Sequence, residues 1–170
     1  MGTATDIQVR AALPADWQEV RELCCESCSE PPFYLTGNEG WPTYGQEDWV
    51  DYSVGPEHAM FLLFDRSTSP PYPIGKARIS TANGDPTTAV ADGIYIRAAY
   101  RGRGLSKLLW EARITWARVH ELRRITTIHR LSNVRSMRSI LTQGFVETER
   151  IPAETISGAT EPELVYELVL

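Results

Sequence analysis

This chain of 170 residues lacks long apolar runs and an excess of positive charge. No apolar stretch approaches the roughly 20 residues that a membrane-spanning helix needs, so no membrane partner is expected. The first residues carry no positive charge followed by an apolar segment, and no signal peptide is predicted. The formal net charge is −5, whereas a generic nucleic-acid binder is usually basic. No nucleic-acid partner is therefore expected.

Cysteines are few, and all three lie within five residues, at Cys24, Cys25 and Cys28. An odd number in one short segment does not form a disulfide framework, and no second pair of ligands is present to complete a metal site. The pattern favours a reduced, cytoplasmic protein without a metal.

Charge is distributed unevenly along the chain. Residues 97–138 carry a net charge of +9, residues 1–96 carry −9 and residues 139–170 carry −5. The central block can attract a polyanion that the rest of the chain repels. A solvated basic helix face would give the same count, so the block alone leaves both interpretations open.

The periodicity of apolar residues predicts a single domain with α/β (α+β) architecture. The predicted strands cover 7–11, 59–65, 74–81, 89–96, 124–129, 145–151 and 164–170. The predicted helices cover 14–28, 46–53, 104–121 and 134–143.

Two glycines, Gly102 and Gly104, separate the fourth predicted strand from the long helix that follows. Glycine allows a tight turn, and the first amides of a helix have no intrahelical acceptor. Such a turn binds phosphate, and Arg101, Arg103 and Lys107 add positive charge around it. The segment lacks the Gly-Lys-Ser/Thr of a P-loop and the third glycine of a dinucleotide fingerprint.

The pattern Arg101-x-x-Gly104-x-Ser106 resembles the pyrophosphate loop of the GCN5-related N-acetyltransferase (GNAT) family, which reads Arg/Gln-x-x-Gly-x-Gly/Ala. Ser106 departs from that pattern, because the family has Gly or Ala there. The extra hydroxyl group is compatible with donation to a phosphate.

A second segment resembles the same family. Asn133, with the small Ser136 three residues later and Gly144-Phe145 at the end of the segment, matches the family's asparagine helix in type and spacing. The resemblance is strongest over about 90–150 and extends in element order over the whole chain. Many members carry a tyrosine seven residues after the asparagine as the acid that protonates the leaving thiolate. Here that position is Ile140, which carries no titratable proton.

The resemblance implies a mixed, mostly antiparallel sheet of six to seven strands flanked by about four helices, with the fourth and fifth strands splayed apart. It implies acetyl-CoA (coenzyme A) as cofactor, bound mainly by 89–150, with 1–88 mainly on the acceptor side. The residues implied in cofactor binding are Ile94, Tyr95, Ile96, Arg101, Gly102, Arg103, Gly104, Leu105, Ser106, Lys107, Asn133, Ser136 and Arg138.

Candidate catalytic residues are few. The attacking amine must lose a proton, and Asp92 or His129 is the candidate base, although a strand-edge acid and a packed histidine are ordinary structural residues. Ser139, beside the position of the missing tyrosine, is a candidate proton donor. A free thiol has a pKa of about 8.5, so the thiolate can also leave without strong acid assistance.

An aromatic-rich segment in the N-terminal half is the candidate acceptor site, through Phe33, Tyr34, Trp41 and Tyr44. Aromatic walls with nearby acids suit a cationic or aromatic amine, but the same residues could form a small core under a long loop. The expected enzyme acetylates a small amine, as a monomer or homodimer. The alternatives are acetylation of a protein N-terminus or lysine, and a catalytically silent acyl-CoA-binding module.

Overall fold

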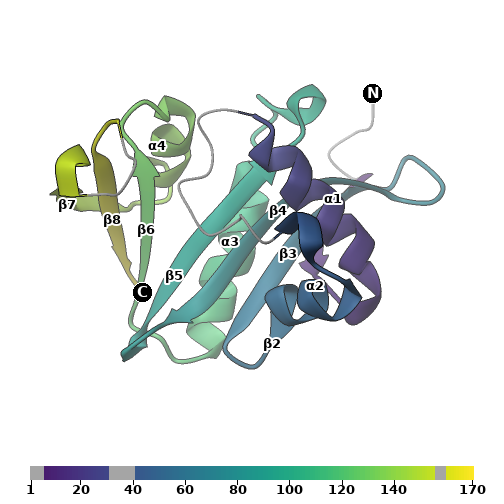
Figure 1. Cartoon of the computed structure of the whole chain (residues 1–170), viewed down its shortest axis with the longest axis horizontal. Coiled ribbons are helices and arrows are strands. Elements are labelled where there is room, and N and C mark those ends of the chain that lie inside the picture. The colour runs from purple at the N-terminus through teal and green to yellow at the C-terminus, as the bar shows by residue number, and fades with distance from the viewer. Residues whose placement is uncertain (1–5, 31–40, 156–159) are drawn as a thin grey trace.

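The computed structural model describes residues 6–30, 41–155 and 160–170. Within these ranges, one sheet of eight strands is flanked by four α-helices (Figure 1). The helices are α1 (Trp17–Cys28), α2 (Gln46–Ser53), α3 (Ser106–Val119) and α4 (Val134–Leu141). The strands are β1 (Ile7–Ala11), β2 (Val54–Gly55), β3 (His58–Asp65), β4 (Tyr72–Ala82), β5 (Asp85–Ile96), β6 (Arg124–Arg130), β7 (Val146–Ile151) and β8 (Glu163–Val169). Among the described helices, none has both the length and the apolar character needed to cross a membrane.

The strand order is β1-β3-β4-β5-β6-β8-β7, with β2 paired to β3. Every pair is antiparallel except β5 and β6, which confirms the predicted mixed, mostly antiparallel sheet. The sheet has one strand more than the six to seven expected. The extra strand is β2, and its two residues are too few to show an alternating pattern.

Helices cover both faces of the sheet, α1 and α2 on one face and α3 on the other (Figure 1). The continuous apolar run of β3 follows from this, because a strand covered on both faces has no solvent-facing side. Phe61 and Leu63 join the core cluster beneath α3. Met60, Leu62 and Phe64 join the cluster beneath α1 and α2.

Strands β5 and β6 pair at one end only, where Thr88–Val90 face Arg124–Thr126. The Thr127 hydroxyl then donates to the Ala91 carbonyl at 2.8 Å, and beyond this point the two strands diverge (Figure 1). The splay predicted from the family resemblance is therefore present. Among the described strands, none pairs with this edge of β5 from Asp92 to Ile96.

A β-bulge lies on β5 beside this opening. Lys76 pairs with Tyr95 and Arg78 with Asp92, so Gly93 and Ile94 together oppose one residue of β4. Gly93 has a φ of 58°, a conformation that favours glycine. The fully buried Lys76 ammonium donates to the Gly93 carbonyl at 2.9 Å, which stabilises the bulge.

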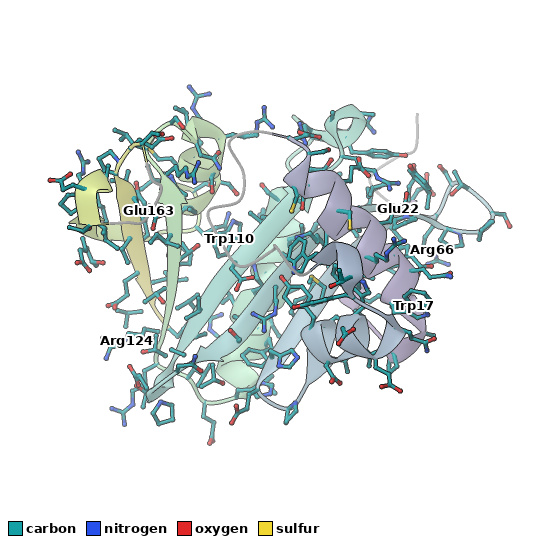
Figure 2. All side chains as sticks on the ribbon, viewed as in Figure 1. Trp17, Glu22, Arg66, Trp110, Arg124 and Glu163 are labelled. Carbon is teal, nitrogen blue, oxygen red and sulfur yellow. The ribbon has the colours of Figure 1, made fainter. Side chains whose placement is uncertain are left out.

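Carboxylates at successive turns of α1 hold the end of β5. Glu22, labelled in Figure 2, and Glu26 both accept hydrogen bonds from the Arg97 guanidinium. The Tyr95 hydroxyl lies 3.0 Å from a Glu26 oxygen and 2.8 Å from a Glu30 oxygen. These contacts attach the α1 helix to the strand end that precedes the glycine loop.

Candidate active site

A cavity of about 610 Å³ opens where β5 ends and where α3 and α4 begin. It is lined by the end of β5, the glycine loop and one face of α4. All the residues predicted to bind the cofactor line it except Arg103. Segments separated by about 40 residues in sequence are thus brought together around one space.

The glycine loop owes its shape to backbone conformation. Gly102 and Gly104 both have a φ of 75°, and no atom lies within 4 Å of the position that a Cβ would occupy at either residue. Glycine is therefore required by the dihedral angle and not by lack of space. The amides of 102–106 donate to no acceptor among the described residues, and α3 adds the positive end of its dipole. This arrangement fits a diphosphate.

The two loop arginines are turned toward protein partners. Arg101 donates to the Ile96 carbonyl at 2.6 Å and to the Glu30 carboxylate at 2.7 Å. Arg103 donates to the Ala99 carbonyl at 2.8 Å and lies outside the cavity lining. Arg101 still borders the cavity, but its charge is already paired.

Helix α4 supplies cationic and polar side chains to the cavity wall. Arg135, Arg138, Ser139 and Thr142 line it, with the spacing of one helical face. Gln143 follows directly after Thr142 in the lining. Of these residues, Arg135, Thr142 and Gln143 were not among the predicted site residues. The helical period, counted from Arg138 and Ser139, would have identified Arg135 and Thr142.

Asn133 borders the cavity and also caps α4. Its side-chain oxygen accepts a hydrogen bond from the Ser136 amide at 3.1 Å. This is the N-cap contact that stabilises a helix start.

Two substitutions at Asn133 separate these roles. Asn133→Ala removes the cap and should cost about 1 kcal/mol, which lowers Tm by roughly 2–4 °C. Asn133→Asp keeps the cap but places a negative charge beside the cavity, so coenzyme A affinity should fall while Tm is kept. Thermal unfolding and calorimetric titration with coenzyme A measure the two effects. Equal coenzyme A affinity in both variants and the wild type would leave Asn133 with the capping role alone.

A second, narrower cavity of about 80 Å³ lies in the splay between β5 and β6. It shares Ile94, Tyr95, Asn133 and Ser136 with the large cavity, so the two are neighbouring parts of one site. The bulged segment of β5 forms one wall, and the end of β6 forms the opposite wall.

His129, at the end of β6, lines this narrow cavity. The ring is 4% exposed and stacks on Tyr166 at 5.2 Å between centroids. Its Nδ1 lies 2.6 Å from the Arg130 carbonyl oxygen, which only accepts hydrogen bonds. Nδ1 therefore carries the proton in the neutral ring, and Nε2 carries the lone pair. Nε2 is buried and has no partner among the described residues.

Asp92 lines the same cavity from the opposite strand. One of its carboxylate oxygens accepts from Arg78 at 3.2 Å, and the side chain is 41% exposed. Of the two predicted bases, Asp92 is thus ion-paired and half-exposed, while His129 is buried with a free lone pair.

Ser139 lines the large cavity and accepts a hydrogen bond from the indole N–H of Trp110, labelled in Figure 2, at 2.9 Å. Because the Ser139 oxygen is the acceptor there, its own hydroxyl proton is available for donation. Ile140, at the position where many family members have tyrosine, is 1% exposed and belongs to the core beneath α3.

Arg113, on α3, is a cavity residue that the sequence analysis did not identify. It lines the narrow cavity although its side chain is fully buried, and its guanidinium stacks 3.6 Å from the centre of the Trp110 ring. Burial lowers its pKa to about 9, so it remains a cation at neutral pH. Burying an ion in this way costs several kcal/mol. The signal was an arginine within the apolar stripe of Leu109 and Ala117, which stand at i−4 and i+4 from Arg113.

Two of the aromatic residues predicted to bind the acceptor, Trp41 and Tyr44, belong to or pack against the core cluster beneath α1 and α2. Trp41 and Tyr44 pack edge-on against Trp49 at 5.6 and 5.3 Å between centroids. Trp41 is 5% exposed, and neither residue lines either cavity. The small-core alternative describes these two residues. Phe33 and Tyr34 lie outside the described residues.

Known proteins with the same fold are numerous. A structure of a GCN5-related N-acetyltransferase from Kribbella flavida superposes with a TM-score of 0.80 at 22% identity, covering 99% of this chain and 100% of that one. The structure of yncA from Salmonella typhimurium with its cofactor acetyl-CoA has a TM-score of 0.79 at 17% identity, covering 97% and 94%. The ribosomal-protein-S5-alanine acetyltransferase from Vibrio fischeri has a TM-score of 0.76 at 17% identity, covering 96% and 93%.

None of the curated proteins compared with the chain matches it. The Acetyltransferase (GNAT) family, in contrast, matches residues 17–145, which is most of the chain and includes both the glycine loop and α4. The residues around the cavities fit that match, because free amides and cations suit a diphosphate and an open strand edge suits the amides of pantetheine. The chain is therefore a member of the GNAT family, an acetyltransferase that uses acetyl-CoA as its acetyl donor.

Proposed function

We propose that this enzyme transfers the acetyl group of acetyl-CoA to the primary amine of a small molecule, such as an amino acid, another amine or an antibiotic-like metabolite. The observation that carries the proposal is that His129 lines the narrow cavity and that its Nε2 has no hydrogen-bond partner among the described residues. A buried base without a hydrogen-bond partner can accept the proton that an attacking amine must lose. A silent acyl-CoA-binding module has no need of one.

The chain's own groups account for each proton and bond. Acetyl-CoA supplies a thioester, whose carbonyl the backbone amides at the β5 bulge would polarise. The acceptor reacts as the neutral amine, after an ammonium has released its first proton to solvent. The amine nitrogen forms a C–N bond to the thioester carbon, His129 Nε2 takes the proton that this nitrogen then loses, and the C–S bond breaks. The thiolate receives a proton from the Ser139 hydroxyl, which water restores with the proton that His129 accepted. The products are an N-acetyl amine and the free thiol of coenzyme A.

Size supports a small acceptor. The narrow cavity has a volume of about 80 Å³, which suits one small group near the thioester. The residues that line the two cavities lie between 91 and 143, inside the range 89–150 that the family resemblance implies for cofactor binding.

Release of coenzyme A thiol from acetyl-CoA tests the proposal against a panel of amino acids, diamines, aromatic amines and a short peptide with a free N-terminus. We expect release above the hydrolysis background with at least one small amine, with the acetylated product identified by mass. Thiol release with the peptide and with no small amine would show that the acceptor is a protein N-terminus and not a small molecule. Tight acetyl-CoA binding without release from any amine would establish the silent module.

A further inference from the structure

The narrow cavity contains more buried positive charge than its protein neighbours neutralise. Arg113 has one long hydrogen bond, from Nη1 to the Asp92 backbone carbonyl at 3.5 Å. Its Nε and Nη2 donate to no acceptor among the described residues, and the Nε of Arg130 is also buried without one. Both arginines line the cavity. The one carboxylate in the described lining, Asp92, is already paired with Arg78.

Such donors indicate a missing acceptor. Buried polar groups in folded proteins are nearly always hydrogen-bonded, and each exception calls for an explanation. The Nε and Nη2 donors of Arg113 suit a carboxylate, which accepts two parallel hydrogen bonds from one arginine. An apolar acetyl methyl group would leave these donors without a partner.

We infer that Arg113 makes the narrow cavity a carboxylate-binding site, so that one of the two substrates carries a carboxylate close to the reacting carbon. This inference rests on the proposed acyl transfer. The carboxylate has two possible sources, the end of a dicarboxylic acyl chain on coenzyme A or the α-carboxylate of an amino acid acceptor. The chemistry of recognition is the same for both, because either anion would be held by the same guanidinium.

The donor arm of the test compares succinyl-CoA with butyryl-CoA, whose chains have the same number of carbons and differ in the carboxylate. The acceptor arm uses acetyl-CoA and compares amino acids with their carboxamides. Both arms are run on the wild type, Arg113→Met and Arg113→Lys. Dissociation constants from calorimetry, measured on the two acyl-CoAs and on the acceptors in the presence of coenzyme A, accompany kcat/KM.

In one arm, the wild type should prefer the carboxylate-bearing compound roughly 10- to 100-fold, in affinity and in kcat/KM. Arg113→Met should bring that ratio close to one, and Arg113→Lys should keep part of it because the charge remains. Arg118→Met, the same change at an exposed position of α3, should keep the wild-type ratio. Arg113→Met should also raise Tm, since it removes a buried charge without a partner.

A wild-type enzyme that shows no preference for the carboxylate in either arm would overturn the inference, as would a preference that Arg113→Met retains. A fall in Tm for Arg113→Met would assign Arg113 a structural role and would also count against it. If Arg113→Met fails to fold, Arg113→Lys is the deciding variant: a reduced preference for the carboxylate supports the inference, and an unchanged preference overturns it. Failure of the proposed function is distinct, because it appears as binding without thiol release, and the affinity ratios still test the carboxylate site.

Discussion

Replacing His129 by asparagine is expected to lower kcat/KM by roughly 100- to 10,000-fold, the range that a general base contributes. Asparagine keeps an N–H donor near the Arg130 carbonyl, where His129 Nδ1 now lies at 2.6 Å, but it removes the Nε2 lone pair. The ring stacking on Tyr166 is also lost, so Tm is measured alongside.

The pH dependence distinguishes a lost base from a damaged fold. A base works only when unprotonated, so kcat/KM of the wild type should fall as the pH drops below the pKa of the base. His129→Asn should lose that acidic limb, and Asp92→Asn should keep it. The reverse result, with the limb lost in Asp92→Asn and kept in His129→Asn, would make Asp92 the base. Coenzyme A affinity is the control for an intact donor site.

Substituting both loop glycines, Gly102→Ala with Gly104→Ala, should weaken coenzyme A binding by roughly 30-fold or more. Each glycine has a φ of 75°, and an L-residue in that region costs about 1–2 kcal/mol. No atom lies within 4 Å of either new methyl group, so the cost comes from the dihedral angle and not from a clash, and the loop lowers that cost by relaxing toward ordinary dihedral angles. Relaxation turns the free amides away from the diphosphate, and a loss of 1.4 kcal/mol in binding is tenfold in affinity.

Gly84→Ala provides a matched control for the double variant. Gly84 has a φ of 80°, has nothing within 4 Å of a built Cβ, and lies in the turn between β4 and β5. Its substitution should lower Tm without changing coenzyme A affinity. Calorimetry on the three proteins makes the comparison. A double variant that binds coenzyme A as tightly as Gly84→Ala does would show that the loop amides do not hold the diphosphate.

Local patterns were sufficient to predict most of the fold. The strand Ile7–Ala11 and the helix Gln46–Ser53 were predicted with the observed bounds. The spacing of apolar residues that indicates a strand or a helix can be read from residues close together in the sequence. The prediction that β5 and β6 diverge came from the family resemblance and not from any local pattern. The two-residue β2 exists only through its pairing with β3, which no short-range signal records.

The site residues were predictable where the backbone conformation defines their role. They were less predictable where the role depends on which tertiary partner the side chain contacts. The positive φ at Gly102 and Gly104 is a property of glycine itself, and Asn133 is a common capping residue. Arg101, in contrast, points to Glu30, about 70 residues away in sequence, through a contact that tertiary structure creates. Charge alone predicts an exposed position for Arg113, whereas its spacing from Leu109 and Ala117 places it on the buried face of α3.

The contacts between α1 and the end of β5 have a consequence for how the substrates meet. Tyr95 and Arg97, at the end of β5, donate hydrogen bonds to three carboxylates, those of Glu22, Glu26 and Glu30. Glu30 also accepts a hydrogen bond from Arg101 of the glycine loop. Charge-assisted bonds at three points keep the helix from tilting away from the strand. The entropy of ordering these contacts is lost during folding and not on binding, so acetyl-CoA meets a strand end and a glycine loop that are already held in place.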